Sequence, residues 1–144
     1  MKVSDCMADD VRIIGPERSL QEAAQAMAEI DAGVLPVAEG DRLVGVITDR
    51  DIAIRAVARG LPPTTEIGKV MSAEVRYCFS DDDSEDVLEN MGDIQVRRLP
   101  VLNRDKRLVG IVSITDLAAQ GEAMLAGEAL GAIGQPSALH SQSL

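Results

Sequence analysis

A direct repeat constrains this chain more than any other feature. One copy contains Leu35-Pro36-Val37, a polar turn and the apolar run 43–48, and the other contains Leu99-Pro100-Val101, a turn and the run 108–113. The copies are offset by 64 residues as far as the prolines and by 65 residues after the turn, so the second turn is one residue longer. Because both copies share one apolar pattern, we expect two copies of the same supersecondary unit.

Each copy predicts a strand, a helix, two strands and a second helix, preceded by a short turn that ends in Met7 or Met71. Apolar runs of strand length alternate with a helix whose apolar positions Leu20, Ala23, Ala24, Met27 and Ile30 share one face. The expected elements are 11–14, 20–30, 34–37, 43–48 and 51–59 in the first copy, and 75–79, 84–91, 98–102, 108–112 and a helix from Ile114 in the second. The fold class is therefore α/β, more closely α+β, with two β-α-β-β-α units related by pseudo-two-fold symmetry.

The repeat also divides the chain. The first unit spans residues 1–60, a linker with Pro62 and Pro63 spans 61–64, and the second unit spans 65–120. Residues 121–144 are expected to form an apolar C-terminal helix followed by a loose tail. Each half is marginal by itself, but 144 residues together can bury a sizeable core.

Composition excludes several classes of function. The net charge of -10 opposes binding to nucleic acid, and an aromatic content of 1% leaves no platform for base stacking. No apolar run is long enough to cross a membrane, and the polar start lacks a secretory signal, so we expect a cytoplasmic protein without membrane contact. Cys6 and Cys78 are expected to be free thiols, their redox role being left open, and the single histidine, His140, makes a His/Cys zinc site improbable.

A hydroxyl residue followed three positions later by a carboxylate ends the apolar run of each copy. The pairs are Thr48 with Asp51 and Ser113 with Asp116. A strand that leads into a helix exposes backbone N–H groups that suit a phosphate, and the carboxylate can accept hydrogen bonds from a ribose. Upstream, Gly45 and Gly110 would let a flat group lie against the backbone.

The same spacing is also that of a capping box, which needs no ligand. The hydroxyl then accepts from a backbone N–H of the first helical turn, and the carboxylate accepts in return. Since a duplicated cap repeats as faithfully as a duplicated site, spacing leaves both interpretations open.

The paired motifs, Leu-Pro-Val, a hairpin and Leu-Val-Gly followed by two apolar residues and Thr/Ser-x-x-Asp, resemble the CBS domain pair, or Bateman module. The resemblance covers about residues 3–120 and is strongest to small stand-alone bacterial two-CBS proteins, including the hypoxic-response type. Such pairs bind adenosine nucleotides or related adenosyl ligands in clefts between their halves. The resemblance assigns ribose contacts to Asp51 and Asp116, phosphate or ribose contacts to Thr48 and Ser113, and the border of the base to Ile14 and Phe79. It assigns phosphate contacts to Arg97 and Arg98, for which the alternative is a solvated pair at the end of a strand.

Two departures from a symmetric pair bear on the ligand. Gly33 and Val34 occupy the register of Arg97 and Arg98, so the two sites should differ. The acidic run 81–86 is expected to be a solvated first helical turn capped by Asp83, but beside a site it would repel a polyphosphate. AMP or an uncharged adenosyl group is therefore favoured over ATP.

These features predict a sensor without catalytic residues. It would bind an adenosine-type ligand of the AMP, ATP, NAD or S-adenosylmethionine class, need no obligatory cofactor, and act in trans on an unknown effector protein. Too much of the helix 51–59 is apolar for a surface helix, which predicts a homodimer. The alternative is a ligand-free structural or interaction module in which Thr48 and Ser113 are caps only.

Overall fold

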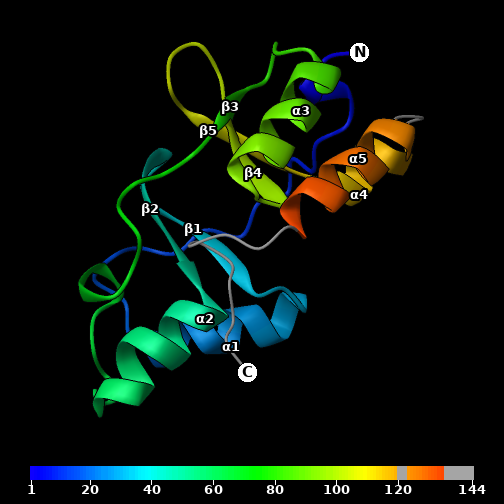
Figure 1. Cartoon of the computed structure of the whole chain (residues 1–144). Helices are drawn as coiled ribbons and strands as arrows, with labels where there is room; N and C mark the ends of the chain where they lie inside the picture. The colour runs from blue at the N-terminus through cyan, green and yellow to red at the C-terminus, as the bar shows by residue number, and fades with distance from the viewer. Residues whose placement is uncertain (120–122, 135–144) are drawn as a thin grey trace. The chain divides into compact units, whose positions relative to one another are not determined.

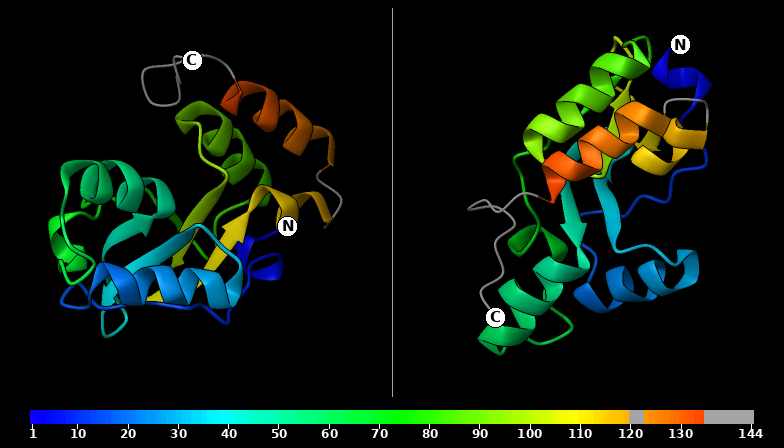
Figure 2. Two further views of the ribbon diagram at one scale, coloured as in Figure 1. Left: turned by 90° about the horizontal axis from the view of Figure 1, so that it is seen from below. Right: turned by 45° about the vertical axis from the view of Figure 1, so that its right-hand side comes forward.

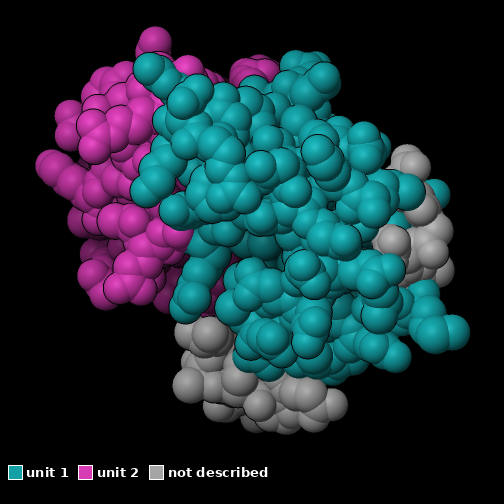
Figure 3. All heavy atoms as spheres, turned by 90° about the horizontal axis from the view of Figure 1, so that it is seen from above, with its two compact units in different colours: residues 1–11, 76–144 teal, residues 12–75 magenta. Residues whose placement is uncertain are grey.

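The computed structural model describes residues 1–119 and 123–134, which form two compact units (Figures 1, 2 and 3). The first-repeat unit comprises Arg12–Val75, and the second-repeat unit comprises Met1–Val11 together with Arg76–Leu144. Each unit has its own hydrophobic core. The two units are therefore described separately.

The first-repeat unit is built on a hairpin. Strand β1 (Val34–Glu39) pairs antiparallel with β2 (Arg42–Thr48), and helix α1 (Leu20–Ile30) precedes them in the chain. Helix α2 (Asp49–Asp51) follows β2 and continues into a π-helical turn, Ile52–Ala56, and a 3-10 turn, Val57–Arg59. The helix predicted over 51–59 is thus present, although its hydrogen bonding changes along its length.

The strand predicted over 11–14 is reduced to a single bridge. Ile14 donates its N–H to the carbonyl of Pro36 at 3.2 Å and accepts from the N–H of Ala38 at 3.0 Å. Pro16 has no N–H to extend this parallel ladder, so the pairing ends at once. Ile14 nevertheless marks the edge of the sheet beside β1.

The second-repeat unit has the same order of elements with a longer ladder. Its sheet has the order β3-β4-β5, in which β3 (Cys78–Phe79) is parallel to β4 (Arg98–Leu102) and β5 (Leu108–Ser113) is antiparallel to β4. The helices are α3 (Ser84–Ile94), α4 (Ile114–Leu117) and α5 (Ala123–Ile133). The strand predicted over 75–79 keeps only its last two residues, and α3 runs beyond the predicted end at Met91 to Ile94.

The first-repeat core lies under α1. Leu20, Ala23 and Met27 are buried as predicted, but Ala26 is buried in place of Ala24, and Ile30 is 41% exposed. The buried face of α1 therefore includes Ala26, the residue before Met27, instead of Ala24. The core is completed by Leu35, Val37, Ile47, Ala56, Ile67 and Val70.

The C-terminal helix completes the second core. Helix α5 packs on α3, where a β-carbon added to Gly92 would lie 3.3 Å from the α-carbon of Ala129. Ala126, Ala129 and Ile133 of α5 are buried there. The predicted apolar helix is confirmed, whereas the predicted loose tail, with His140, lies outside the described residues from 135 onward.

The short turn at the start of each repeat packs in the unit that holds the rest of the other repeat. The turn Val3–Asp5 belongs to the second-repeat unit, where Val3 donates to the carbonyl of Asp82 at 3.0 Å and Ala8 bridges to Ile111. In the first-repeat unit the turn Ile67–Lys69 leads to a bridge between Ser72 and Val46. The compact units consequently divide the chain at other residues than the repeat copies do. Within the described ranges, no helix is long and apolar enough to span a membrane.

Candidate functional site

The junctions at which β2 enters α2 and β5 enters α4 have the same local geometry. In the first, Thr48 Oγ1 accepts from the N–H of Asp51 at 3.0 Å, and Asp51 Oδ2 accepts from the N–H of Thr48 at 3.1 Å. In the second, Ser113 and Asp116 make the same two bonds, both at 3.0 Å. Thr48 and Ser113 share φ -117° and ψ 160°. The predicted capping boxes are therefore confirmed, and any ligand must use what the caps leave available.

Each aspartate has a second carboxylate oxygen, and the two differ in surroundings. Asp51 Oδ1 lies 3.7 Å from Arg55 Nε, and the Asp51 side chain is only 15% exposed. Within the described ranges, no hydrogen bond or ion pair reaches the second oxygen of Asp116. In the second repeat the position that corresponds to Arg55 is Gln120, a neutral residue that lies outside the described ranges. Asp116 is thus the more available acceptor.

The backbone of the first helical turn differs as well. The N–H of Asp49 donates to Gly33 O at 2.9 Å, and the N–H of Ile114 donates to Arg97 O at 3.0 Å. The next N–H, that of Arg50, is taken by Asp49 Oδ1 at 2.8 Å. The corresponding N–H of Thr115 has no acceptor in the part of the chain that is described.

The predicted arginine pair lies next to Ser113. Arg98 is the register partner of Ser113 across β4 and β5, and both arginines are exposed. Neither guanidinium has a hydrogen-bond or ion-pair partner among the described residues. In the first-repeat unit Val34 faces Thr48, and a β-carbon added to Gly33 would lie 2.5 Å from Asp49 Oδ2. The β5–α4 junction thus has the unpaired Arg97 and Arg98 at the register where the β2–α2 junction has Gly33, covered by the Asp49 carboxylate, and Val34.

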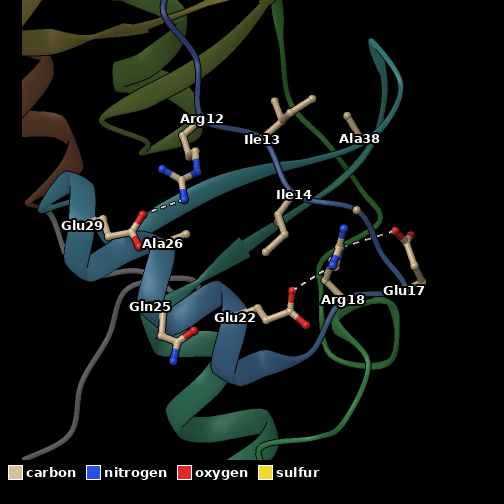
Figure 4. Close-up of a pocket in the computed structure, with 11 residues that line it drawn as sticks. Arg12, Ile13, Ile14, Glu17, Arg18, Glu22, Gln25, Ala26, Glu29 and Ala38 are labelled. Atoms are coloured by element: carbon tan, nitrogen blue, oxygen red, sulfur yellow. Dashed lines mark hydrogen bonds and ion pairs between the residues drawn. The ribbon is translucent and has the colours of Figure 1, made fainter.

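The structure places Ile14 and Phe79 differently from one another. The register partner of Ile14 is Val37 and that of Cys78 is Val101, so the counterpart of Ile14 is Cys78 and not Phe79. Ile14 is half-buried and lines an open groove of about 480 Å³ beside α1 (Figure 4). Arg12 and Glu29 form an ion pair at 2.7 Å across this groove.

Phe79 belongs to a cluster that the sequence reasoning missed. Its ring packs edge to face against Tyr77, with ring centroids 5.5 Å apart. The guanidinium carbon of Arg104 lies over the Phe79 ring, 4.1 Å from its centroid. Arg104 Nη2 pairs with Asp81 Oδ1 at 2.7 Å, and this hydrogen bond lowers the pKa of the Asp81 carboxyl. The available signal was that the chain's single Tyr and single Phe lie two residues apart, within the strand predicted over 75–79.

The acidic run therefore has two parts. Asp83 caps α3 as predicted, with Oδ1 accepting from the N–H of Glu85 at 2.9 Å. Asp81 and Asp82 instead hold Arg104, since Arg104 Nη2 also lies 3.6 Å from Asp82 Oδ1. Their negative charge is partly neutralised beside Phe79.

The expectation that Gly45 and Gly110 leave room for a flat ligand is wrong. Methionine sulfur fills the place of the missing β-carbon at both glycines: Met71 Sδ lies 2.6 Å from that position at Gly45, and Met7 Sδ lies 2.6 Å from it at Gly110. The glycines are therefore needed for packing between chain segments.

The two cysteines are buried and neither forms a disulfide, as predicted. Both belong to the second-repeat core, and burial, with a smaller contribution from Asp82, raises the pKa of Cys78 to about 12. Across residues 1–119 and 123–134, no group of three or more His, Cys, Asp or Glu side chains is placed to hold a metal ion.

Comparison with known proteins agrees with this architecture. The family model of the CBS domain matches residues 3–57 and 67–121, and the chain therefore belongs to the CBS domain family as a tandem pair. CBS domain-containing protein YhcV of Bacillus subtilis is 40% identical over 116 residues, which cover 81% of this chain and 82% of YhcV. Hypoxic response protein 1 of Mycobacterium tuberculosis is also 40% identical over 116 residues, with coverage of 79% and 80%.

Solved structures give the same result. The chain matches the crystal structure of Hypoxic Response Protein I, described with two coordinated zinc ions, with a TM-score of 0.75 and 38% identity over 83% of this chain and 98% of that one. It matches the CBS domain pair of protein MJ0100, in complex with 5′-methylthioadenosine and S-adenosyl-L-methionine, with a TM-score of 0.73 and 26% identity over 86% of this chain and 98% of that one.

Proposed function

We propose that this CBS domain pair is a cytoplasmic regulatory protein that binds an adenosine-type ligand, with AMP favoured at the β5–α4 junction. One observation carries the proposal: Arg97 and Arg98 have no partner among the described residues and lie beside Ser113 and Asp116. The protein performs no chemistry on the ligand. Its output is a ligand-dependent change that an effector protein reads in trans.

The junction offers complementary groups to a nucleoside monophosphate. A carboxylate oxygen that is not used by the cap can accept from the ribose hydroxyls, and the Thr115 N–H and two guanidiniums can donate to the phosphate oxygens. Arginine suits this role because its planar fork matches a phosphate. The complex of the MJ0100 CBS pair with adenosyl compounds supports the adenosine part of the proposal.

Ligand binding can regulate only if it favours one state of the protein over another. A ligand that bridges the carboxylate of Asp116 and the guanidiniums of Arg97 and Arg98 would link the start of α4 to the start of β4. An effector that recognises this arrangement would therefore respond to ligand concentration.

A panel of adenosine compounds tests the proposal directly. Melting temperatures are measured with AMP, ADP, ATP, NAD and S-adenosylmethionine at fixed protein concentration, because a ligand that binds the native state raises apparent stability by mass action. We expect the largest rise with AMP. Guanosine monophosphate serves as the matched control for the phosphate, and an equal rise with it would contradict adenosine recognition.

The second candidate is a ligand-free interaction module. Both hydroxyl-carboxylate pairs are complete capping boxes without any ligand, which is the observation that favours it. In that case no compound of the panel raises the melting temperature.

We also propose that the chain forms a homodimer. In the first-repeat unit Ile54 is 49% exposed, Val57 is 68% exposed and Leu61 is 39% exposed, and these apolar residues follow one another on the segment after α2. A symmetric dimer would remove this apolar surface from water by using the same surface of both chains.

A further inference from the structure

We propose that the two repeats select different adenosyl ligands, with Asp49 as the specificity-determining residue. The β2–α2 junction excludes a 5′-phosphate and takes an adenosine derivative whose 5′ substituent is uncharged or cationic. The β5–α4 junction takes the monophosphate. This inference rests on the proposed function, because it assumes that each junction holds an adenosine group.

The first argument is the position of the Asp49 carboxylate. It lies over Gly33, with Oδ2 2.5 Å from the place of a β-carbon, and Gly33 holds the register of Arg97 in the other repeat. Both carbonyls at this register accept from the first N–H of the following helix, at 2.9 and 3.0 Å, so the two backbones superpose in their hydrogen bonding. At this register, therefore, the first repeat presents the negative charge of Asp49 where the second repeat presents the positive charge of Arg97.

The second argument is that Asp49 removes a phosphate donor. Its Oδ1 accepts from the N–H of Arg50 at 2.8 Å, which fixes the carboxylate at the junction. The counterpart of Asp49 is Ile114, which has no acceptor atom in its side chain, and the N–H of Thr115 stays available. A phosphate at the first-repeat junction would meet a fixed carboxylate instead of a free backbone donor.

The third argument concerns Asp51. Its Oδ2 accepts from Thr48 and its Oδ1 lies 3.7 Å from Arg55, so this arginine is already engaged. Arg50 is exposed to solvent and directly follows Asp49, whose charge has the opposite sign. An anionic ligand would find Arg55 engaged and the charge of Arg50 offset by that of Asp49, whereas a thioether or sulfonium group carries no negative charge to repel.

The experiment isolates the first-repeat junction by combining Asp116→Ala with Arg97→Ala and Arg98→Ala, because the arginines would still hold a phosphate after Asp116→Ala alone; this triple variant is called the Asp116→Ala protein. Binding of AMP and 5′-methylthioadenosine is measured by calorimetry. We expect this variant to bind 5′-methylthioadenosine at least about tenfold more tightly than AMP, which is the size of effect that one nearby charge produces. Adding Asp49→Asn keeps the acceptor for the Arg50 N–H but removes the charge, and should tighten AMP binding about tenfold with little change for 5′-methylthioadenosine. Glu39→Gln, at the opposite end of β1, is the control for loss of a charge and should leave both affinities unchanged.

A conversion variant tests the same idea by gain of function. Gly33→Arg with Asp49→Ile gives the first repeat the residues of the second at these two positions, and the isoleucine removes the carboxylate that would collide with the new β-carbon. In the Asp116→Ala background this pair of substitutions should also create AMP binding. Should the conversion variant fail to fold, the Asp49→Asn comparison still decides the question.

The outcomes separate the inference from the proposed function. Equal affinity of the Asp116→Ala protein for both compounds, or no effect of Asp49→Asn, overturns the assignment of Asp49. Binding of AMP by the wild type with no binding of either compound after Asp116→Ala overturns the inference and leaves the proposed function intact. A wild type that binds neither compound overturns both.

Discussion

Met71 places its sulfur against the backbone of Gly45, with Sδ 2.6 Å from the position that a β-carbon would occupy. Met71 lies near the start of the second repeat in the sequence, yet it belongs with Gly45 of β2 to the first-repeat unit. Met7 and Gly110 make the same contact in the second-repeat unit. In both units a glycine in the second hairpin strand thus provides the slot that holds the exchanged turn.

This relationship predicts that Gly45→Ala destabilises the first-repeat unit. The methionine side chain can move, but the carbonyl oxygen of Ser72, 2.9 Å from the new β-carbon, belongs to the backbone that bridges to Val46. Overpacking of this kind costs about 1–3 kcal/mol. We therefore expect Gly45→Ala to lower the free energy of unfolding by that amount, which chemical denaturation measures.

The matched control is Gly127→Ala in α5. A β-carbon there meets nothing within 4 Å, so the substitution should stabilise the helix by about 1 kcal/mol. Equal effects of the two substitutions would show that the slot at Gly45 is unimportant.

Local patterns in the sequence predicted the elements of each repeat because they depend on near neighbours. Thr48 with Asp51 and Ser113 with Asp116 are three residues apart, and both capping boxes form as the spacing indicates. The hairpins follow from apolar runs that flank a polar turn. The resemblance to the CBS domain pair rested on the same local motifs.

Contacts between distant segments could not be predicted in this way. The bridges of Ala8 to Ile111 and Ser72 to Val46 depend on which segment fills the glycine slots, and no local spacing encodes that choice. Arg104 reaches Phe79 because the β4–β5 turn carries it there, so its pairing with Asp81 was also missed. The Asp49 carboxylate over Gly33 could not be predicted either, because it depends on how the β1–β2 hairpin brings the residue before β1 next to the residue after β2.

The difference between the junctions predicts unequal effects of two substitutions on AMP binding. Asp116→Ala should weaken binding more than Asp51→Ala, because the unpaired arginines lie beside Asp116 whereas Asp51 is already engaged by Arg55. Loss of a hydrogen bond to a charged group corresponds to about tenfold or more in affinity. Calorimetry with AMP measures both variants, and equal losses would contradict unequal sites.

Burial of Cys78 predicts an unreactive thiol. Its pKa is raised from 9.0 to about 12, so at pH 8 the folded protein holds it as the neutral thiol, which is a poor nucleophile. In a Cys6→Ser protein, modification by a maleimide should be slow under native conditions and rapid after unfolding. Fast modification of the native protein would show that the thiol is accessible.

The same shift affects stability at high pH. The unfolded chain releases the Cys78 proton above about 9.0, whereas the folded chain retains it to about 12. The free energy of unfolding should therefore fall as the pH rises between these values, since the folded state binds more protons there. Cys78→Ala should reduce this slope relative to wild type, and an unchanged slope would assign the loss to other groups.

The proposed dimer predicts that a charge on the exposed apolar segment prevents association. Val57 is 68% exposed, so Val57→Glu removes no packing within the chain but places a carboxylate where the dimer would bury apolar surface. Light scattering at micromolar concentration should give a dimer for wild type and a monomer for the variant. Ala28→Glu, at an exposed position of α1 outside that segment, is the control and should leave the dimer intact. A monomeric wild type would contradict the proposal.

The hydroxyls of Thr48 and Ser113 allow the cap and the ligand contact to be separated. As caps alone, each contributes about 1 kcal/mol to stability, whether or not nucleotide is present. If they also contact the ligand, replacement by alanine should additionally reduce the stabilisation that AMP confers, because a hydrogen bond to the ligand is lost together with the cap.

The double variant Thr48→Ala, Ser113→Ala is melted with and without saturating AMP at fixed protein concentration, since the melting temperature of a dimer depends on concentration. We expect a lower melting temperature without AMP and a smaller AMP-induced rise than in wild type. A rise equal to that of wild type would leave both hydroxyls as caps alone, and no rise in wild type would favour the ligand-free module.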